Sequence, residues 1–416
     1  MRFLHVADIH LGNYQYNNKQ RYNDFFLAFK QVAELAVTQQ IQVCIVAGDL
    51  FHKAAVDALT LLQAEDCLKV MREAGIRVLA VAGNHDRLRY GDTFSWLEYL
   101  QETDYLTLLK PSFGDSQQSC IVPNETYVDL DGVRFIGVPY FGSGSRTAFE
   151  RVAIDLDQLD NDGIHFTVLI THAGIEGQIP TAGGCVTLAD LQKLRSYVDY
   201  FATGHLHKPF VIDDWIYNPG AIENCDFNEE NYRSLGKGVF IVEVGSNGQA
   251  QIDKLSIHGR PFYTLIFAVD AYLQPDELVR NLTDMVRNES LKWMSDEEHL
   301  PVVRLILRGN LPFDRTQLDI EQIRYKLEGE ITCLLLKMQV EINGFEVSID
   351  ASQEIGFDVL ERQIFEEFAR SDSRYSSAAE SWAALMRDIK AVALNENSPD
   401  YIYERLQMQM RLHGNE

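Results

Sequence analysis

Residues 5–12 read HVADIHLG, a short apolar run that ends in the polar pair Asp8 and His10. Four later stretches repeat this pattern of an apolar, β-branched run followed at once by polar residues: VCIVAGD at 43–49, VLAVAGN at 78–84, FTVLITH at 166–172 and YFATGH at 200–205. Runs of this length and composition are typical of β-strands. Because most of them lack an alternating polar face, both faces of each strand should be covered. The pattern therefore predicts an α/β fold, with β-sheets buried under helices.

The rest of the chain divides into further segments by the same criteria. Helical periodicity at residues 24–39 and 56–73 separates the first strands, and VRFIGVPY at 133–140 adds another sheet element. We predict that this first domain covers residues 1–257. Near Arg260-Pro261 the pattern changes to strand, helix, strand, helix, strand, which predicts a small α+β domain over residues 258–350.

The C-terminal part, residues 351–416, has no predicted strand. Residues 357–370, 378–394 and 399–412 read as three amphipathic helices. Ser398 is the expected N-cap of the third helix, and Pro399 occupies its first helical position. We therefore expect a helical C-terminus.

Composition restricts the class of protein. Hydrophobic residues make up 46% and charged residues 24% of the 416 residues, which is ordinary for a globular protein. No apolar run is long enough for a membrane-spanning helix, and the acidic, histidine-bearing first ten residues do not resemble a secretion signal. The six cysteines form no CxxC pair, which is consistent with reduced thiols. We expect a cytoplasmic protein that does not enter a membrane.

The net charge of −24 bears on nucleic-acid binding. Non-specific affinity for DNA comes mainly from phosphate contacts made by lysine and arginine. Neither the first 230 residues nor the remainder is basic. Any tight grip on DNA must therefore be local or supplied by a partner.

The polar clusters that follow the strands carry the candidate chemistry. Carboxyl ends of parallel strands gather the ligand-binding loops of an α/β sheet. Carboxylate, amide and imidazole ligands suit a pair of divalent cations, and mixed nitrogen and oxygen ligation without thiolate favours manganese, iron or zinc over magnesium alone or copper(I). The clusters are Asp8/His10, Asp49, Asn84/His85/Asp86, His172 and His205/His207.

Each cluster also has a structural interpretation when taken alone. Asp49 could cap a turn or helix, GNHD at 83–86 could form a tight turn, and His172 could be a hydrogen-bonded core residue. Five such coincidences at five strand ends are much harder to explain by local structure. We therefore favour a metal site.

The order D-x-H, GD, GNHD, H, GH-x-H resembles the signature of calcineurin-like metallophosphoesterases. HVADIHLG, AGDLFH, GNHD, TGHLHKP and NPGAIE are more closely similar to the nuclease subunit of the bacterial SbcCD and archaeal break-repair complexes. The likeness continues through HGRPF at 258–262 and the small domain that follows. It implies a metallophosphoesterase sandwich with a capping domain, and a two-metal DNA exonuclease or endonuclease of double-strand-break repair.

This resemblance also implies a role for each site residue. One cation is expected on Asp8, His10, Asp49 and His207, and the other on Asp49, Asn84, His172 and His205, so that Asp49 bridges the two. Manganese is the expected metal, with iron, zinc or magnesium as alternatives. The catalytic residues are expected to be His85, backed by Asp86 and placed near the leaving oxygen, and His52, placed near the scissile phosphate.

Further residues could contact nucleic acid, although exposed loops and salt bridges are the competing interpretation. These are Tyr14, Tyr16, Lys19, Arg21, Lys53, Arg87, Arg89 and Lys208. The resemblance also implies a homodimer through residues 56–73 and 94–101. The C-terminal helices resemble the region that docks the coiled coil of an SMC-like ABC ATPase, but they could instead pack on the capping domain.

Two other functions remain open from the residues alone. One is a stand-alone phosphodiesterase acting on nucleotides or small phosphoesters. The other is a binding scaffold with an inactive site, against which the complete ligand set argues.

Overall fold

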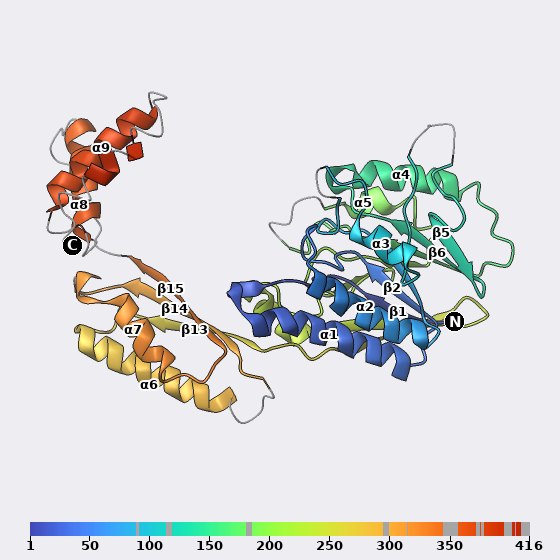
Figure 1. Ribbon diagram of the computed structural model, residues 1–416, viewed down its shortest axis with the longest axis horizontal. Coiled ribbons are helices and arrows are strands. Elements are labelled where there is room, and N and C mark those ends of the chain that lie inside the picture. Colours follow the sequence, from blue (N-terminus) through green and yellow to red (C-terminus); the bar gives the residue numbers. More distant parts are fainter. Residues whose placement is uncertain are drawn as a thin grey trace. The chain divides into compact units, whose positions relative to one another are not determined.

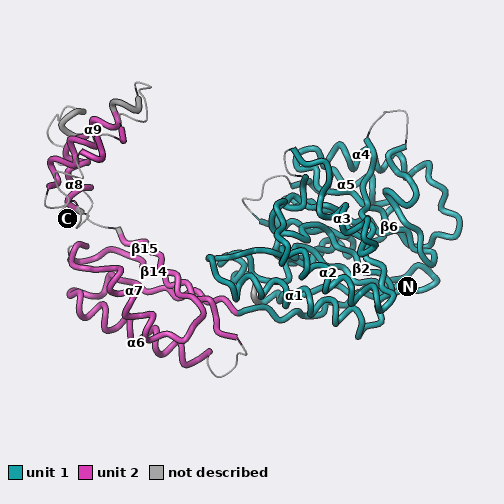
Figure 2. Tube along the Cα trace, in the orientation of Figure 1, with its two compact units in different colours: residues 1–260 teal, residues 261–416 magenta. Residues whose placement is uncertain are grey.

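A computed structural model describes residues 1–88, 91–113, 119–179, 185–293, 299–313, 315–343, 357–371, 375, 378–394, 402–403 and 405–408. The chain forms two units, residues 1–260 and residues 261–416 (Figure 2). The division falls at Arg260-Pro261, where the sequence pattern changes. Among the described residues, no helix is both long and apolar enough to cross a membrane.

The first unit contains two six-stranded sheets (Figure 1). In the first sheet the order is β12-β11-β1-β2-β3-β4; β1 to β4 are parallel neighbours, while β11 and β12 add antiparallel strands at one side. The bounds are β1 Arg2–Val6, β2 Val43–Ala47, β3 Arg77–Val81, β4 Thr107–Leu108, β11 Gly238–Val244 and β12 Ala250–Ser256.

The second sheet has the order β5-β6-β7-β8-β10-β9. Its four inner strands are parallel, and both edge strands are antiparallel to their neighbours. The bounds are β5 Tyr127–Leu130, β6 Val133–Val138, β7 Phe166–Thr171, β8 Tyr200–Ala202, β9 Phe210–Ile212 and β10 Ile216–Asn218.

The two sheets share one core. Phe3 of β1 packs edge-on against Phe135 and Tyr200 of the second sheet, with ring centroids 5.4 Å apart in both pairs. Valine, isoleucine and leucine side chains from both sheets are buried around these rings. Each fully buried side chain of this kind contributes about 1.5–3 kcal/mol relative to an exposed one. This shared core holds the ends of β1 and β8 in fixed positions relative to each other.

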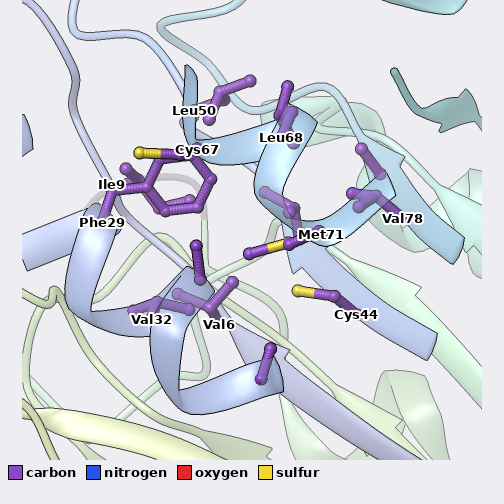
Figure 3. Close-up of a cluster of buried hydrophobic side chains, with 14 of the residues drawn as sticks. Val6, Ile9, Phe29, Val32, Cys44, Leu50, Cys67, Leu68, Met71 and Val78 are labelled. Carbon is purple, nitrogen blue, oxygen red and sulfur yellow. The ribbon is translucent and has the colours of Figure 1, made fainter. Parts of the chain in front are cut away.

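Helices cover the outer faces of both sheets. Helices α1 (Lys19–Thr38), α2 (Ala58–Glu73) and α3 (Trp96–Glu102) lie on the first sheet, and α4 (Ser145–Leu156) and α5 (Leu188–Leu191) on the second. Figure 3 shows side chains from α1 and α2 packing together with those of the strands beneath them. The predicted α/β sandwich is confirmed. Short 3₁₀ helices occur at Gln15–Asn17, Gly142–Gly144 and Phe227–Leu235.

Local capping fixes where the first helices start. The predicted helix 24–39 begins earlier, at Lys19, because the Asn18 side chain accepts hydrogen bonds from the backbone N–H groups of Gln20 and Arg21. Helix α2 begins at Ala58 because Asp57 accepts from Leu59 and Thr60 in the same way. Both caps replace hydrogen bonds that the first turn of a helix cannot make internally.

A network of buried charged side chains lies at the C-terminal end of the first unit. The Asp24 carboxylate accepts hydrogen bonds at 2.6 Å from Arg21 Nη1 and from Arg260 Nε. Glu223 accepts from both Nη atoms of Arg21 at 3.2 Å and from the backbone N–H of Arg260 at 2.9 Å. All four side chains are buried. Such a network holds only when every charge is matched.

The second unit begins with the predicted order of strand, helix, strand, helix, strand. Its three strands form a parallel sheet in the order β13-β14-β15, and apolar side chains of both helices pack on the sheet. The bounds are β13 Phe262–Ala268, α6 Pro275–Trp293, β14 Val302–Asn310, the 3₁₀ turn Arg315–Gln317, α7 Ile320–Glu328 and β15 Leu335–Asn343.

Two C-terminal helices follow, α8 (Phe357–Ser371) and α9 (Ala379–Leu394). They pack against each other, and Glu361 of α8 pairs with Arg387 and Lys390 of α9. Most of the predicted third helix at 399–412, including Ser398 and Pro399, lies outside the described residues.

Candidate metal centre

The fold brings the polar clusters together because each follows the carboxyl end of a parallel strand. The first sheet supplies the residues after β1, β2 and β3, and the second sheet those after β7 and β8. All seven predicted ligands lie in one connected group. They are Asp8, His10, Asp49 and Asn84 from the first sheet, and His172, His205 and His207 from the second.

Two sets of donor atoms can be distinguished within the group. In one, His10 Nε2 lies 3.0 Å from His207 Nε2 and 3.8 Å from Asp49 Oδ2. In the other, Asn84 Oδ1 lies 3.1 Å from His172 Nε2 and 2.9 Å from His205 Nδ1. Asp49 Oδ2 is also 3.3 Å from His172 Nε2, so this carboxylate lies next to both sets.

The backbone is strained where several of these side chains begin. Asp8, His10, Asp49 and His205 have φ values of 52°, 54°, 53° and 81°. This left-handed conformation is unfavourable for residues with a side chain, and it occurs at functional sites that the surrounding structure holds in place. The strain aims the side chains of short loops into one space rather than along the strand direction.

Two glycines of the motifs lie where a side chain would not fit. A Cβ atom at Gly83 would lie 2.0 Å from Asp49 Oδ1, and one at Gly48 would lie 2.3 Å from His172 Nδ1. Both distances are far below van der Waals contact. The glycines of GD and GNHD therefore allow the loops to approach the carboxylate and imidazole that they surround.

The donor set fits a divalent cation. Asp8 is 1% exposed, and its Oδ1 accepts a hydrogen bond from the backbone N–H of His205 at 3.1 Å. Its Oδ2 is buried and has no hydrogen-bond partner among the described residues. Burial raises the pKa of Asp8, because a carboxylate removed from water is unfavourable, and His172 and His207 only partly oppose this effect. A cation among these oxygen and nitrogen donors would satisfy the free oxygen.

Hydrogen bonds behind the imidazoles determine which nitrogen each ring presents. His172 Nδ1 donates to the carbonyl oxygen of Ala47 at 2.8 Å, and His207 Nδ1 donates to Glu229 Oε1 at 2.7 Å. Since both partners only accept, the Nδ1 atoms carry protons, and Nε2 is the atom that each ring turns towards the donor group. Glu229 also accepts from Lys237 Nζ at 2.8 Å. Burial alone would raise the pKa of Glu229, but Lys237 and His207 lower it to about 2.

Glu229 was not found from the sequence. It lies in the 3₁₀ segment Phe227–Leu235, far from any strand-end motif, and no local pattern singles it out. Cys225 lies two residues beyond the NPGAIE stretch and was also missed, because a single cysteine there has no ligand spacing to mark it, although its thiol lies near His10 and His207.

The predicted catalytic residues lie beside the ligands. His85 Nδ1 donates to the backbone oxygen of His52 at 2.6 Å, and the two rings stack with centroids 5.3 Å apart. The His85 backbone N–H donates to Asp49 Oδ1 at 2.9 Å. His10 meets the His85 ring edge-on at 5.0 Å. Both predicted histidines therefore border the candidate metal site.

The prediction that Asp86 backs the His85 ring needs correction. The Asp86 carboxylate accepts from the backbone N–H groups of Leu50, Phe51 and Gly83 at 3.3, 2.9 and 3.0 Å. It thus ties the loop after β2 to the loop after β3. The His85 ring instead donates to the backbone carbonyl of His52, so Asp86 positions the two loops and does not contact the His85 ring through a hydrogen bond.

The predicted nucleic-acid contacts differ in exposure. Arg21 is fully buried in the charge network, so we withdraw it as a DNA-contacting residue. Lys208 donates to the backbone oxygen of Gln178 at 3.1 Å. Tyr16 packs on Phe227. Four of the predicted residues are exposed: Tyr14, Lys19, Lys53 and Arg87. The guanidinium of Arg87 lies over the Tyr140 ring. Arg89 lies outside the described residues.

A two-sheet α/β sandwich with converging carboxylate, amide and imidazole donors at its strand ends defines a metal-dependent hydrolase. Residues 1–209 match the calcineurin-like phosphoesterase family. The chain belongs to this family, whose members use divalent metal ions to hydrolyse phosphoesters.

Relatives extend the likeness beyond the matched domain. The DNA double-strand break repair protein Mre11 of Archaeoglobus fulgidus is 32% identical over 55% of this chain, which spans 52% of that relative. The protein of the same name from Aeropyrum pernix is 26% identical over 82% of this chain and 81% of its own length. Among solved structures, the calcineurin-like phosphoesterase YfkN from Bacillus subtilis aligns over 71% of this chain with 15% identity and a TM-score of 0.40, which is too distant to inform the site.

Proposed function

We propose that this chain is a DNA nuclease of double-strand-break repair that hydrolyses phosphodiester bonds with two divalent cations. The observation that carries the two-cation centre is the position of Asp49, whose Oδ2 lies 3.8 Å from His10 Nε2 and 3.3 Å from His172 Nε2. A carboxylate between two donor sets is what a bridged pair of cations requires. The name shared by the relatives supports DNA as the substrate.

We assign the ligands to the two cations as the family resemblance implies, and the contacts of His10 with His207 and of Asn84 with His172 and His205 support this division. Asp8, His10 and His207 would hold one cation, and Asn84, His172 and His205 the other, with Asp49 shared. Oxygen and imidazole donors favour manganese, with iron, zinc and magnesium as alternatives. Bound cations would supply Lewis-acid chemistry and neutralise the charge that develops on the phosphate during cleavage.

His85 is suited to move the proton that cleavage requires. Its Nδ1 is engaged by the backbone oxygen of His52 at 2.6 Å, so the ring is oriented and Nε2 is the atom left to exchange a proton with the leaving sugar oxygen. An imidazole can donate a proton near neutral pH. His52, stacked on His85, would lie along the phosphate.

The acidic chain needs local basic groups to hold DNA. Lys53 and Arg87 are exposed and adjoin His52 and Asp86 in the sequence. They could bind the strand entering the site, and Tyr14, Tyr16, Lys19 and Lys208 could extend the contact. With a net charge of −24, these few groups give weak binding by themselves. We propose that a partner supplies the remaining grip.

Two partnerships are proposed. Exposed apolar side chains on and next to α2 and α3 support a homodimer, since patches of this kind mark interfaces; they are Leu59, Leu62, Val70, Phe94 and Trp96. On α8, Phe368 is 63% exposed, whereas Leu385 of α9 is 7% exposed. We propose that this exposed part of the helical pair docks the coiled coil of an SMC-like ABC ATPase in the cytoplasm.

The test is Asp49→Ala, compared with Asp66→Ala on the exposed face of α2. Wild type and Asp66→Ala should carry two manganese ions per chain by elemental analysis and should cleave linear duplex DNA in manganese buffer. Asp49→Ala should lose both ions and the cleavage while keeping its circular dichroism spectrum. Two ions in the variant would refute the bridging role. If wild type hydrolyses nucleotide esters and no ATPase stimulates it to cleave duplex DNA, it is a stand-alone phosphodiesterase.

A further inference from the structure

The thiol of Cys225 lies at the candidate metal centre but belongs to none of the expected ligands. Its Sγ and ring nitrogens of His10 and His207 all lie within 4.8 Å of one another. Cys225 follows β10 on the segment that leads into the 3₁₀ turns, and it is only partly buried. An ion that reaches the two imidazoles could therefore also reach the sulfur.

The segment that carries the thiol is fixed to the same carboxylate as one of these imidazoles. Glu229 Oε1 accepts from the backbone N–H of Cys225 at 3.1 Å and from His207 Nδ1 at 2.7 Å. On the other side, Gln15 Nε2 donates to the backbone oxygen of Cys225 at 2.7 Å. Cys225 and His207 are thus held in a defined relation, so the nearness of the thiol is built into the fold.

An independent observation indicates that an ion belongs between these groups. His10 is 1% exposed, and its Nε2 faces His207 Nε2 at 3.0 Å. Because His207 Nδ1 donates to Glu229, Nε2 is the nitrogen that this ring offers to an ion. The buried Asp8 Oδ2, which has no hydrogen-bond partner among the described residues, lies in the neighbouring donor group with Asp49 and His172.

The spacing suits tetrahedral coordination. Zinc–nitrogen bonds of about 2.0–2.1 Å and zinc–sulfur bonds of about 2.3 Å place ligand atoms roughly 3.3–3.7 Å apart in a tetrahedron. The two Nε2 atoms are 3.0 Å apart, and Asp49 Oδ2 lies 3.8 Å from His10 Nε2. The sulfur lies within 4.8 Å of a nitrogen of each ring, so movement of the Cys225 side chain towards the two nitrogens would complete the site.

We propose that Cys225, His10, His207 and Asp49 form a thiolate-containing site for thiophilic divalent cations of the zinc class. The proposal rests on the proposed function, because three of these ligands also belong to the manganese site. Binding replaces the S–H bond by a sulfur–metal bond and releases one proton to solvent. The chain then has two alternative ligand sets: an oxygen-rich set with Asp8 that suits manganese, and a set with Cys225 that suits zinc.

The test uses cobalt(II), which stands in for zinc and reports its ligands by absorption. Wild type titrated with cobalt should show a sulfur-to-cobalt charge-transfer band in the near ultraviolet. Cys225→Ser should lose this band but keep the weaker visible bands of cobalt on the remaining ligands. The matched control Cys333→Ser, in the second unit, should keep both. Zinc affinity should fall at least about 10-fold in Cys225→Ser, while manganese affinity stays within about 3-fold.

Each outcome bears on the proposal. Cobalt bound to wild type without the charge-transfer band overturns the thiolate site and leaves the proposed nuclease centre standing. No cobalt binding to wild type overturns both. A band that persists in Cys225→Ser and in Cys225→Ala assigns the sulfur to another cysteine and also overturns the proposal. Circular dichroism of both variants shows whether they fold.

Discussion

His5 should make the stability of the first unit depend on pH. The ring lies buried between the two sheets, where Tyr200 OH is 3.0 Å from Nδ1 and the backbone oxygen of Thr203 is 3.2 Å from Nε2. The Thr203 carbonyl oxygen can only accept, so Nε2 carries the proton, Nδ1 accepts from the Tyr200 hydroxyl, and the ring is neutral. Burial lowers the pKa of His5 from 6.5 to about 3, and the Thr203 hydrogen bond only partly opposes this.

The sign and size of the effect follow from this pKa. Between pH 6.5 and about 3 the unfolded chain binds a proton on His5 that the folded chain does not. The stability contribution is therefore complete above pH 6.5 and is lost progressively as the pH falls towards 3. At about pH 5.5 the unfolded state gains RT ln 11, so unfolding becomes easier by about 1.4 kcal/mol.

The experiment compares wild type, His5→Gln and Tyr200→Phe in chelator, so that metal binding does not contribute. Urea unfolding is followed by hydrogen exchange of peptides from β1 at about pH 7.5 and about pH 5.5. Glutamine can still donate to Thr203 but does not titrate. The difference in unfolding free energy between wild type and His5→Gln should therefore shrink by about 1.4 kcal/mol at the lower pH. Tyr200→Phe keeps the imidazole and should keep the wild-type pH dependence. A deficit of His5→Gln that is the same at both pH values would refute the argument.

Three further changes test other parts of the structure. His85→Ala should keep both metal ions and lose about 10²–10⁴-fold in duplex cleavage; a nitrophenyl ester, whose leaving group needs no proton, should be affected less, and equal losses would exclude His85 as the proton donor. Asp24→Asn leaves Arg21 and Arg260 short of a buried counter-charge and should destabilise the first unit by about 3–5 kcal/mol in thermal unfolding. The exposed control Asp66→Asn should change stability little, and an equally small effect of Asp24→Asn would contradict the prediction. Deleting residues 356–416 should abolish ATPase-stimulated cleavage without affecting metal content; survival of that stimulation would place the partner elsewhere.

The sequence was sufficient to predict the first-unit fold and the grouping of the ligand candidates. Carboxyl ends of neighbouring parallel strands must meet at one edge of a sheet, so Asp8, Asp49 and Asn84 could be placed together from their position after apolar runs. His172 and His205 could be grouped with them by the same argument, but the structure shows that they come from a second sheet. Strand periodicity alone does not show that two sheets share an edge.

The residues that sequence reasoning missed or misplaced depend on contacts across long stretches of chain. Arg21 looks like a surface cation in sequence, and its burial depends on Glu223 about 200 residues later. Asp86 adjoins His85 in sequence, yet neighbouring side chains point apart, and its carboxylate turns towards the loop after β2. Glu229 lies in a 3₁₀ segment and Cys225 in the turns before it, and neither stretch has a periodicity that predicts the direction of a side chain.

The candidate ligands span residues 8 to 207 and come from both sheets. During synthesis, a nascent chain that has formed only the first parallel strands lacks the imidazoles of the second sheet and cannot enclose a cation. Metal capture must therefore wait until both sheets have closed on their common core. A cation that binds only this closed state adds its binding free energy to the work of unfolding. Chelation should consequently loosen the sandwich as a whole, and metal supply in the cell would influence how long the folded protein persists.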